Sequence, residues 1–138
     1  MRKRTSSREF ALQVLYQVDL AATPAREALE NFWAAQRLDV GQDVKDYTEM
    51  LVLGVLGHLE AIDRLIEKFA ENWVIQRMAY VDRNILRLST FEMRHREDIP
   101  VKVAINEAVE LAKRYGEPDS SKFVNGILDR IAKTETKP

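Results

Sequence analysis

The sequence predicts an all-α protein of about seven helices, arranged as two small packed helical bundles within one domain. Apolar residues recur at spacings of three and four along most of the chain, which is the periodicity of one helix face. The alternating pattern of a half-buried strand is hard to find. The five glycines and four prolines stand mostly where the periodic segments end, so they separate helices.

The first two helices are predicted from their starts. A Ser-x-x-Glu capping box beginning at Ser6 predicts a helix over residues 6–21. Thr23 has the character of an N-cap, and Pro24 after it suits the first helical position. We therefore expect a second helix from Pro24 to about residue 37.

The next periodic stretch is too long for one unbroken helix. An Asp-x-x-Gln box beginning at Asp39 opens it, and its apolar face continues to Phe69. Gly54 and Gly57 permit a bend, so we expect one helix to end and another to begin near residues 57–60.

Three more helices follow in the second half of the chain. Residues 81–96 are apolar on most sides, which predicts a helix through the middle of the fold. Proline ends it, and residues 101–115 form an amphipathic helix that we expect Gly116 to close with a left-handed cap. Asp119 or Ser120 then caps the last helix. Helices can pack on helices only, so we expect subdomains over about 5–77 and 78–134.

Composition excludes several classes of protein. No apolar run approaches the ~20 residues that a membrane helix needs. The chain has no cysteine, which excludes thiolate metal sites, iron–sulfur clusters and disulfides. We expect a cytoplasmic protein with no membrane segment, no metal and no cofactor.

Little in the sequence suggests catalysis. The two histidines, His58 and His95, do not have the spacing of a metal site, and no phosphate loop or nucleophile elbow is present. Glu92 falls on the buried stripe of the central helix. Such a carboxylate is more often a structural group bonded to arginine than a general base. A small helical enzyme using Arg83, Arg87 and Glu92 stays open as an alternative.

Positive charge is gathered at the start of the chain. Residues 1–23 hold four basic and two acidic residues, residues 24–71 five and ten, and residues 72–138 twelve and ten, although the net charge is only −1. The four cations are Arg2, Lys3, Arg4 and Arg8. Arginine forks and lysine point charges suit phosphate, so this end could follow a nucleic-acid backbone. A solvated terminus is the alternative.

Two aromatic residues lie beside the main apolar stripes of their helices. Phe123 starts the last helix next to Lys122, and Tyr16 is on the first helix. Proteins hold single-stranded RNA with backbone cations and rings that stack on unpaired bases. Both rings could equally be boundary core residues. The RNA interpretation requires the basic start and Phe123 to share one groove.

Three segments carry a resemblance to a known family. The sequences "SREFALQVLYQVD", "VDRNILRLSTFEM" and "IPVKVAINEAVELAKRYGEPDSSKFVNGILDRI" resemble the NusB family of bacterial transcription antitermination factors. The likeness extends over about residues 4–132. It implies an all-helical fold of two subdomains and no enzymatic activity.

The resemblance also implies a function and a set of site residues. Members of the family bind single-stranded boxA RNA together with the ribosomal protein NusE. With other Nus factors in the elongation complex, they help RNA polymerase read through terminators, notably in ribosomal RNA operons. The RNA-binding residues implied here are Arg2, Lys3, Arg4, Arg8, Asp119, Ser120, Lys122 and Phe123, and the partner residues are Tyr16 and Asp82.

Some points stay open at this level. Thr5, Ser6 and Ser7 separate Arg4 from Arg8, so the resemblance does not say which of the cations touches phosphate. An RNA-binding domain like those of ribosomal RNA methyltransferases is the second interpretation. A homodimer is also left open.

Overall fold

The chain folds into seven α-helices and one short 3-10 helix. The structure is a computed structural model, and it describes residues 2–36 and 39–134, with no strand among them. The elements are α1 (Arg2–Ala21), α2 (Ala25–Ala35), α3 (Gln42–Gly57), α4 (Leu59–Phe69), η1 (Ile75–Arg77), α5 (Tyr80–His95), α6 (Val101–Tyr115) and α7 (Ser120–Thr134). The all-α prediction is confirmed.

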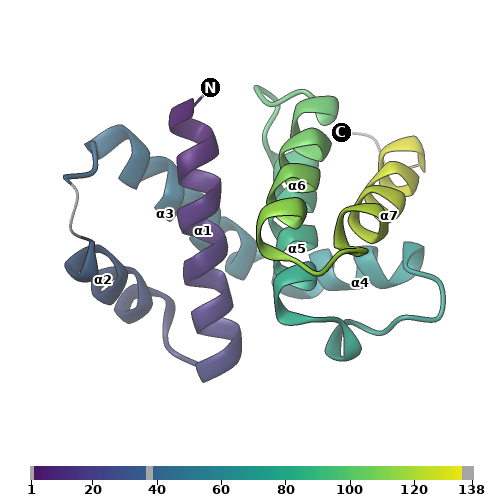
Figure 1. The fold of residues 1–138 in the computed structure, drawn as a ribbon, viewed down its shortest axis with the longest axis horizontal. Coiled ribbons are helices and arrows are strands. Elements are labelled where there is room, and N and C mark those ends of the chain that lie inside the picture. The colour runs from purple at the N-terminus through teal and green to yellow at the C-terminus, as the bar shows by residue number, and fades with distance from the viewer. Residues whose placement is uncertain (1, 37–38, 135–138) are drawn as a thin grey trace.

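Helix α5 is the centre of the fold. It packs against α1, α3, α4, α6 and α7, and every residue from Arg83 to Met93 is buried. Figure 1 shows α1, α2 and α3 on one side of it and α6 and α7 on the other, with α4 crossing behind. This agrees with the sequence prediction of a helix through the middle of the fold.

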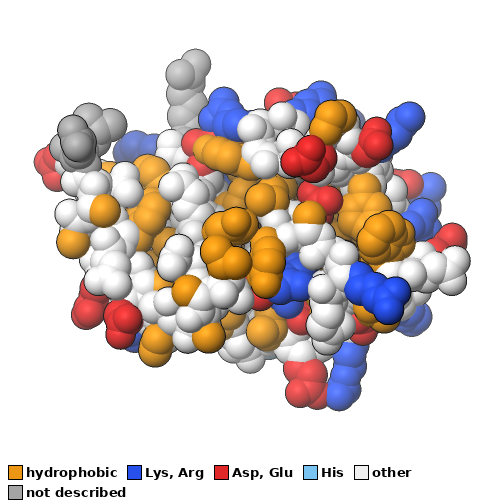
Figure 2. Space-filling model, turned by 60° about the horizontal axis from the view of Figure 1, so that its bottom comes forward, with side chains coloured by type: hydrophobic (Ala, Val, Ile, Leu, Met, Phe, Trp, Pro, Cys, Tyr) orange, Lys and Arg blue, Asp and Glu red, His pale blue; other side chains and the backbone are white. Residues whose placement is uncertain are grey.

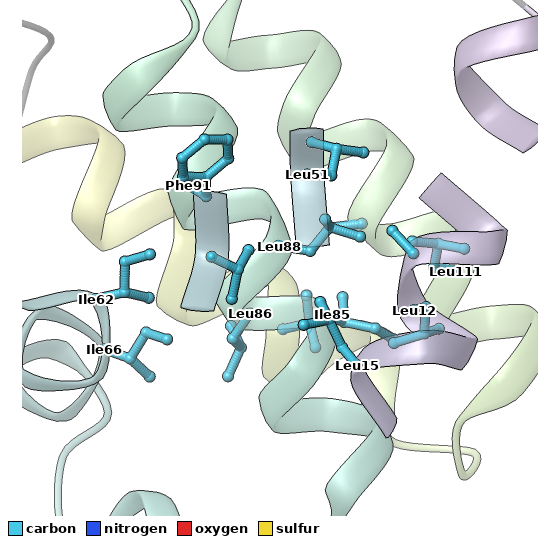
Figure 3. Packing of buried hydrophobic residues seen from close by; sticks show 14 of the residues in the cluster. Leu12, Leu15, Leu51, Ile62, Ile66, Ile85, Leu86, Leu88, Phe91 and Leu111 are labelled. Carbon is cyan, nitrogen blue, oxygen red and sulfur yellow. The ribbon is translucent and has the colours of Figure 1, made fainter. Parts of the chain in front are cut away.

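One continuous core joins the two sides. In Figure 3, Leu12 and Leu15 of α1 and Leu51 of α3 meet one side of α5, while Ile62 and Ile66 of α4 meet another. Helix α4 also packs on α7. The division into subdomains at residues 77 and 78 stays a prediction.

The predicted start of the first helix is wrong. Helix α1 begins at Arg2, so Ser6 lies inside the helix and forms no capping box. Neighbouring Ser7 is fully buried, and its Oγ donates to the backbone oxygen of Val44, 3.0 Å away on α3. Contacts with α3 therefore hold this end, where the sequence predicted local capping.

Two other predicted caps are also wrong. Pro24, not Thr23, is the N-cap residue of α2, and it makes no side-chain cap. Helix α3 begins at Gln42 after Gly41, again without a side-chain cap, so Asp39 is not its first residue. The helices exist where periodicity predicted them, but short polar motifs did not locate their ends.

Gly116 follows α6 in an extended conformation. Its φ is −95° and its ψ is −172°, so the left-handed cap that the sequence predicted does not form. A Cβ on this residue would lie 2.6 Å from the Cβ of Ser120 and 2.8 Å from the backbone oxygen of Ala112. Glycine is needed here because the turn into α7 passes close to the end of α6.

A buried polar cluster joins four helices. The Nε of Arg8 on α1 donates to Glu92 of α5 at 2.8 Å, and its Nη1 donates to Glu107 of α6 at 2.9 Å. The Tyr47 hydroxyl of α3 donates to the other oxygen of Glu92 at 2.5 Å. Burial and this hydrogen bond to a carboxylate raise the pKa of Tyr47. Glu92 is thus a structural group paired with an arginine, the more frequent of the two roles considered from sequence.

Gly54 and Gly57 should respond in opposite ways to alanine. A Cβ at Gly54 would lie 2.6 Å from Cε1 of Phe91, whereas a Cβ at Gly57 meets nothing within 4 Å. Gly54→Ala should lower the free energy of unfolding by about 1–3 kcal/mol, because α3 must move away from α5. Gly57→Ala should be neutral or raise it by about 0.5–1 kcal/mol. Urea unfolding followed by circular dichroism measures both, and equal stabilities would contradict the close α3–α5 contact.

Removing the Arg8 guanidinium should destabilise the fold strongly. Arg8 is 3% exposed and Glu92 is 1% exposed, so Arg8→Met leaves a buried carboxylate without its cation. Loss of one partner of such a pair costs about 3–5 kcal/mol. The control is Arg64→Met on α4, whose pair with Glu60 is about three-quarters exposed; it should change stability by less than about 0.5 kcal/mol. Similar losses in the two variants would argue against this anchor.

Candidate nucleic-acid interface

The start of α1 presents two cations that are already paired. Lys3 Nζ lies 2.9 Å from a carboxylate oxygen of Asp43, and Arg4 Nη1 lies 3.0 Å from one of Asp98. The hydrogen bond to Asp43 raises the pKa of Lys3. Both pairs are at the surface, where ion pairs are weak and exchange readily. The side chain of Arg2 lies outside the part of the chain that the structure describes.

Arg8 differs from the other cations of the basic start. Its guanidinium is buried and bonded to Glu92 and Glu107, so in this structure it is not available to a phosphate. It acts as an anchor that joins α1 to α5 and α6.

The start of α7 combines exposed and buried residues. Asp119 and Lys122 are exposed, and Phe123 is half-buried. Ser120 is only 3% exposed, and its Oγ accepts a hydrogen bond from the Glu117 amide at 2.9 Å. Its hydroxyl therefore holds the turn between α6 and α7.

A hollow of about 280 Å³ lies at this turn. It is lined by Trp73, Arg77, Met78, Ala79, Asp82, Glu117, Asp119, Ser120 and Phe123. The rings of Trp73 and Phe123 meet edge to face, with centroids 5.6 Å apart. Asp82 Oδ1 is buried and has no hydrogen-bond partner among the described residues. The hollow thus offers two rings, a cation at its edge and a free acceptor.

Sequence reasoning missed Trp73 and Arg77. Both lie in the irregular segment between α4 and α5, where no periodicity marks an exposed face. The two residues before Trp73, Glu71 and Asn72, have φ of 30° and 64°. This left-handed turn leaves Trp73 48% exposed beside α7. A tryptophan between two predicted helices, directly after Glu71 and Asn72, was the available signal.

The cations of α1 and the ring of Phe123 do not share one pocket. Figure 1 shows the start of α1 at the top of the view, whereas α7 starts lower down, beside the lower end of α6. Between them runs the seam of α1 and α6, with a hollow of about 240 Å³ that includes Lys113 and Arg114. These two side chains are 60% and 64% exposed, and Arg114 pairs with Glu9. The sequence predicted a single groove for the basic start and Phe123, and the structure does not contain it. The cations of α1 and the ring of Phe123 lie at separate sites, with the charged seam of α1 and α6 between them.

The two predicted partner residues lie at the same end of the fold. Tyr16 of α1 meets Tyr80 at the start of α5, with ring centroids 5.9 Å apart, and Asp82 is two residues further along α5. Tyr80 is 38% exposed and Leu20 is 51% exposed. Figure 2, which brings the lower end of Figure 1 forward, shows hydrophobic side chains gathered among charged ones.

The residues of the enzyme hypothesis lie in two separate networks. Arg83 forms a bidentate pair with Asp19, with both distances 2.7 Å, and Arg87 pairs with Asp63 at 2.8 and 2.9 Å. Burial alone would raise the pKa of Asp19, but hydrogen bonds from Arg83 and its neighbours outweigh it and lower that pKa. Glu92 belongs to the other network, where no space for a water-sized molecule remains beside it. These side chains form no common catalytic centre.

The described residues contain no candidate metal site and no candidate membrane span. Within them, no group of three or more histidine and acidic side chains is placed to hold a metal ion. None of the described helices is both long enough and apolar enough to span a bilayer.

The fold and these surfaces define an all-helical binding protein with charged and aromatic contact sites. A family model described as "NusB family" matches residues 5–133. Transcription antitermination protein NusB of Myxococcus xanthus is 48% identical over 140 residues, covering 100% of both chains. NusB of Bacillus subtilis is 46% identical and covers 94% of both. The chain belongs to the NusB family of transcription antitermination factors, and it is not an enzyme.

Solved structures of the family share the fold. A structure of T. maritima NusB superposes with a TM-score of 0.87 at 40% identity, covering 100% of this chain and 94% of that one. A structure of the antitermination factors NusB and NusE in complex with dsRNA gives a TM-score of 0.87 at 33% identity, covering 96% and 98%.

Proposed function

We propose that this antitermination factor works in the cytoplasm by binding single-stranded boxA RNA together with the ribosomal protein NusE. Assembled with other Nus factors on the elongation complex, it helps RNA polymerase read through terminators, notably in ribosomal RNA operons. The observation that carries the RNA part is the hollow at the start of α7, where Trp73 and Phe123 stand beside Arg77. The similar NusB–NusE complex supports both partners.

The strand would run along the seam between α1 and α6. Lys3 and Arg4 precede Thr5 and Glu9, the α1 residues that line the hollow of this seam. Lys113 and Arg114 line it from α6, and Phe123 lines the separate hollow at the start of α7. Phosphates would displace Asp43 and Asp98 from the first two cations. Because each neutralised phosphate releases counterions, RNA binding should weaken steeply as salt rises.

The base contacts belong to the aromatic end of this path. An unpaired base can stack on the exposed face of Trp73 or Phe123, since every base has a π-face. Asp82 Oδ1 supplies an acceptor for a base or for a partner, because it has no donor within the described part of the protein. In this proposal the bases bind at Trp73 and Phe123, and the phosphates bind at the cations of α1 and α6.

The NusE surface is proposed around Tyr16 and Asp82. Tyr80 and Leu20 add exposed apolar area at this end of the molecule. Asp82 also lines the hollow that contains Phe123, so a partner seated on Asp82 would lie beside the bound RNA. This shared edge gives a physical reason for RNA and partner to bind together.

The methyltransferase interpretation has less support. The curated relatives that match over 94% or more of this chain carry the name transcription antitermination protein. No observation on the described residues favours a domain that serves a methyltransferase.

Removing a ring from the hollow should weaken boxA binding. Phe123→Ala and Trp73→Ala should each cost about 1–3 kcal/mol if their rings stack on bases. Fluorescence anisotropy of labelled boxA RNA measures the loss. The control is Val74→Ala, whose side chain is 47% exposed next to Trp73 but does not line the hollow. Unchanged affinity in both ring variants would show that these rings only pack.

The same titration at several salt concentrations tests whether RNA phosphates bind along the seam of α1 and α6. Lys113→Gln should reduce the slope of log affinity against log salt by about one. Lys133→Gln, which changes an exposed lysine near the end of α7, should leave the slope unchanged. Equal slopes for the two variants would place the backbone path elsewhere.

Tyr80→Ala should weaken NusE binding in the absence of RNA. Truncating an exposed ring at the centre of an interface typically costs more than about 1 kcal/mol, or about fivefold in affinity. Tyr115→Ala is the matched control, because Tyr115 is 39% exposed at the end of α6. Isothermal titration calorimetry with NusE measures both. A loss confined to Tyr115→Ala would move the partner surface away from Tyr16.

A further inference from the structure

The outer face of α7 carries a line of side chains that the core does not use. The residues that α7 buries against the fold are Ser120, Val124, Ile127, Leu128 and Ile131. On the far side, Lys122, Gly126 and Arg130 follow one another at intervals of four, so they form one stripe along the helix, called here the α7 stripe. In Figure 1 this helix lies at the edge of the molecule, away from α1, α2 and α3.

The two cations of the α7 stripe form no ion pair with a described residue. Lys122 is exposed and makes no polar contact within the described part of the chain. Arg130 is also exposed, and its Nε donates to the backbone oxygen of Phe69, 3.0 Å away at the end of α4. A backbone carbonyl holds the guanidinium in place but does not neutralise it. Asp129, the neighbour of Arg130 in sequence, is paired with Lys133 at 3.1 Å.

The α7 stripe adjoins the hollow at the start of α7. Phe123 follows Lys122 in sequence and lies one turn before Gly126. Arg77, at the edge of the same hollow, is a third exposed cation that forms no ion pair with a described residue. Further cations without such a pair are scattered over α2, α3 and α6, as Arg26, Lys45 and Lys102. Uncompensated positive charge is therefore gathered around this end and side of α7.

Gly126 keeps the middle of the α7 stripe open. A Cβ at this position would contact Nη1 of Arg130 at 3.8 Å, which is an ordinary van der Waals distance. The packing of the protein therefore leaves room for a larger residue, although glycine inside a helix is less favourable than alanine. Glycine also allows a ligand to approach the backbone closely. Lys122 and Arg130 are eight residues apart, or about 12 Å along the helix axis, with this gap between them.

We propose that the α7 stripe binds single-stranded RNA that flanks boxA, leading the strand away from the hollow of Trp73 and Phe123. Lys122 and Arg130 contact phosphates, and the RNA backbone passes over Gly126. The inference rests on the proposed function, because it extends the RNA that the hollow binds. Contacts to phosphate carry no base information, so the flanking nucleotides can have any sequence.

The chemistry of the α7 stripe favours a phosphate backbone over an acidic protein segment. The terminal nitrogens of Arg130 form a fork that matches two phosphate oxygens, since the bond to Phe69 uses Nε. The adjoining hollow supplies aromatic rings on which bases can stack, and an acidic peptide has no use for them. Cations that hold no carboxylate lose no ion pair when a phosphate binds.

Three labelled RNAs provide the test: boxA alone, boxA followed by a uridine tract, and boxA preceded by the same tract. Fluorescence anisotropy measures their affinities at one salt concentration. We expect one of the two tracts to tighten binding by about fivefold, the gain from one exposed charge-assisted contact. The other tract should add little, because only one end of boxA leaves the hollow toward α7. Equal affinities for the three RNAs overturn this inference, whereas loss of binding to boxA itself overturns the proposed function.

Arg130→Gln should remove the gain from the uridine tract and leave binding of boxA alone unchanged. It should also reduce the slope of log affinity against log salt by about one for the extended RNA. Arg26→Gln is the matched control, since Arg26 is an exposed arginine on α2 without an ion pair to a described residue. A gain that survives Arg130→Gln, or that Arg26→Gln removes equally, overturns the inference.

Gly126→Gln should likewise remove the gain, because its side chain occupies the space over which the backbone passes. Glutamine favours a helix more than glycine does, so thermal unfolding should show no loss of stability. Gly57→Gln is the control, since a Cβ at Gly57 also meets nothing within 4 Å. A full gain in Gly126→Gln contradicts the proposed path. Polyglutamate that displaces the extended RNA as well as a uridine oligomer does would assign the α7 stripe to an acidic protein and overturn the RNA assignment.

Discussion

The fold depends on the burial of polar side chains along α5. This helix is covered on all sides, yet it carries Arg83, Arg87 and Glu92. Charged groups in such a place destabilise a protein unless each meets a partner. Asp19 and Arg8 of α1, and Asp63 of α4, supply those partners. Helices α1 and α4 are thereby fixed in register against α5, because each pair forms at only one relative position.

This constraint divides the basic start of the chain into two parts. Arg8 is buried in the core, where its bonds to Glu92 and Glu107 join α1 to α5 and α6. Lys3 and Arg4 lie one or more turns earlier and stay at the surface. The four cations look alike in sequence, but in the structure Arg8 is a buried anchor. Lys3 and Arg4 form surface ion pairs that can exchange partners. The net charge of −1 conceals both.

The contact surfaces are made where helices end. The left-handed turn at Glu71 and Asn72 brings Trp73 to Phe123, and Gly116 lets the turn after α6 pass close to Ser120. The meeting of His58 with His95 has the same origin, since His58 is the residue between α3 and α4 and His95 is the last of α5. The helical core holds these residues in place, and the conformations of the segments between the helices determine which of them are in contact.

The sequence by itself determined the helices, the central place of α5 and the family, because periodicity and motif are properties of neighbouring residues. It favoured a structural role for Glu92 and left the enzyme alternative open. It did not determine the helix starts. Helix α1 extends to Arg2, with Ser7 bonded to α3, and α3 begins at Gln42 without a side-chain cap. Only the tertiary structure showed that Arg8 is buried, that the ring of Trp73 meets that of Phe123, and that no residue of α1 lines the hollow of that ring. Arg8 meets Glu92 across 84 positions of chain, and a contact at that separation depends on how the helices pack.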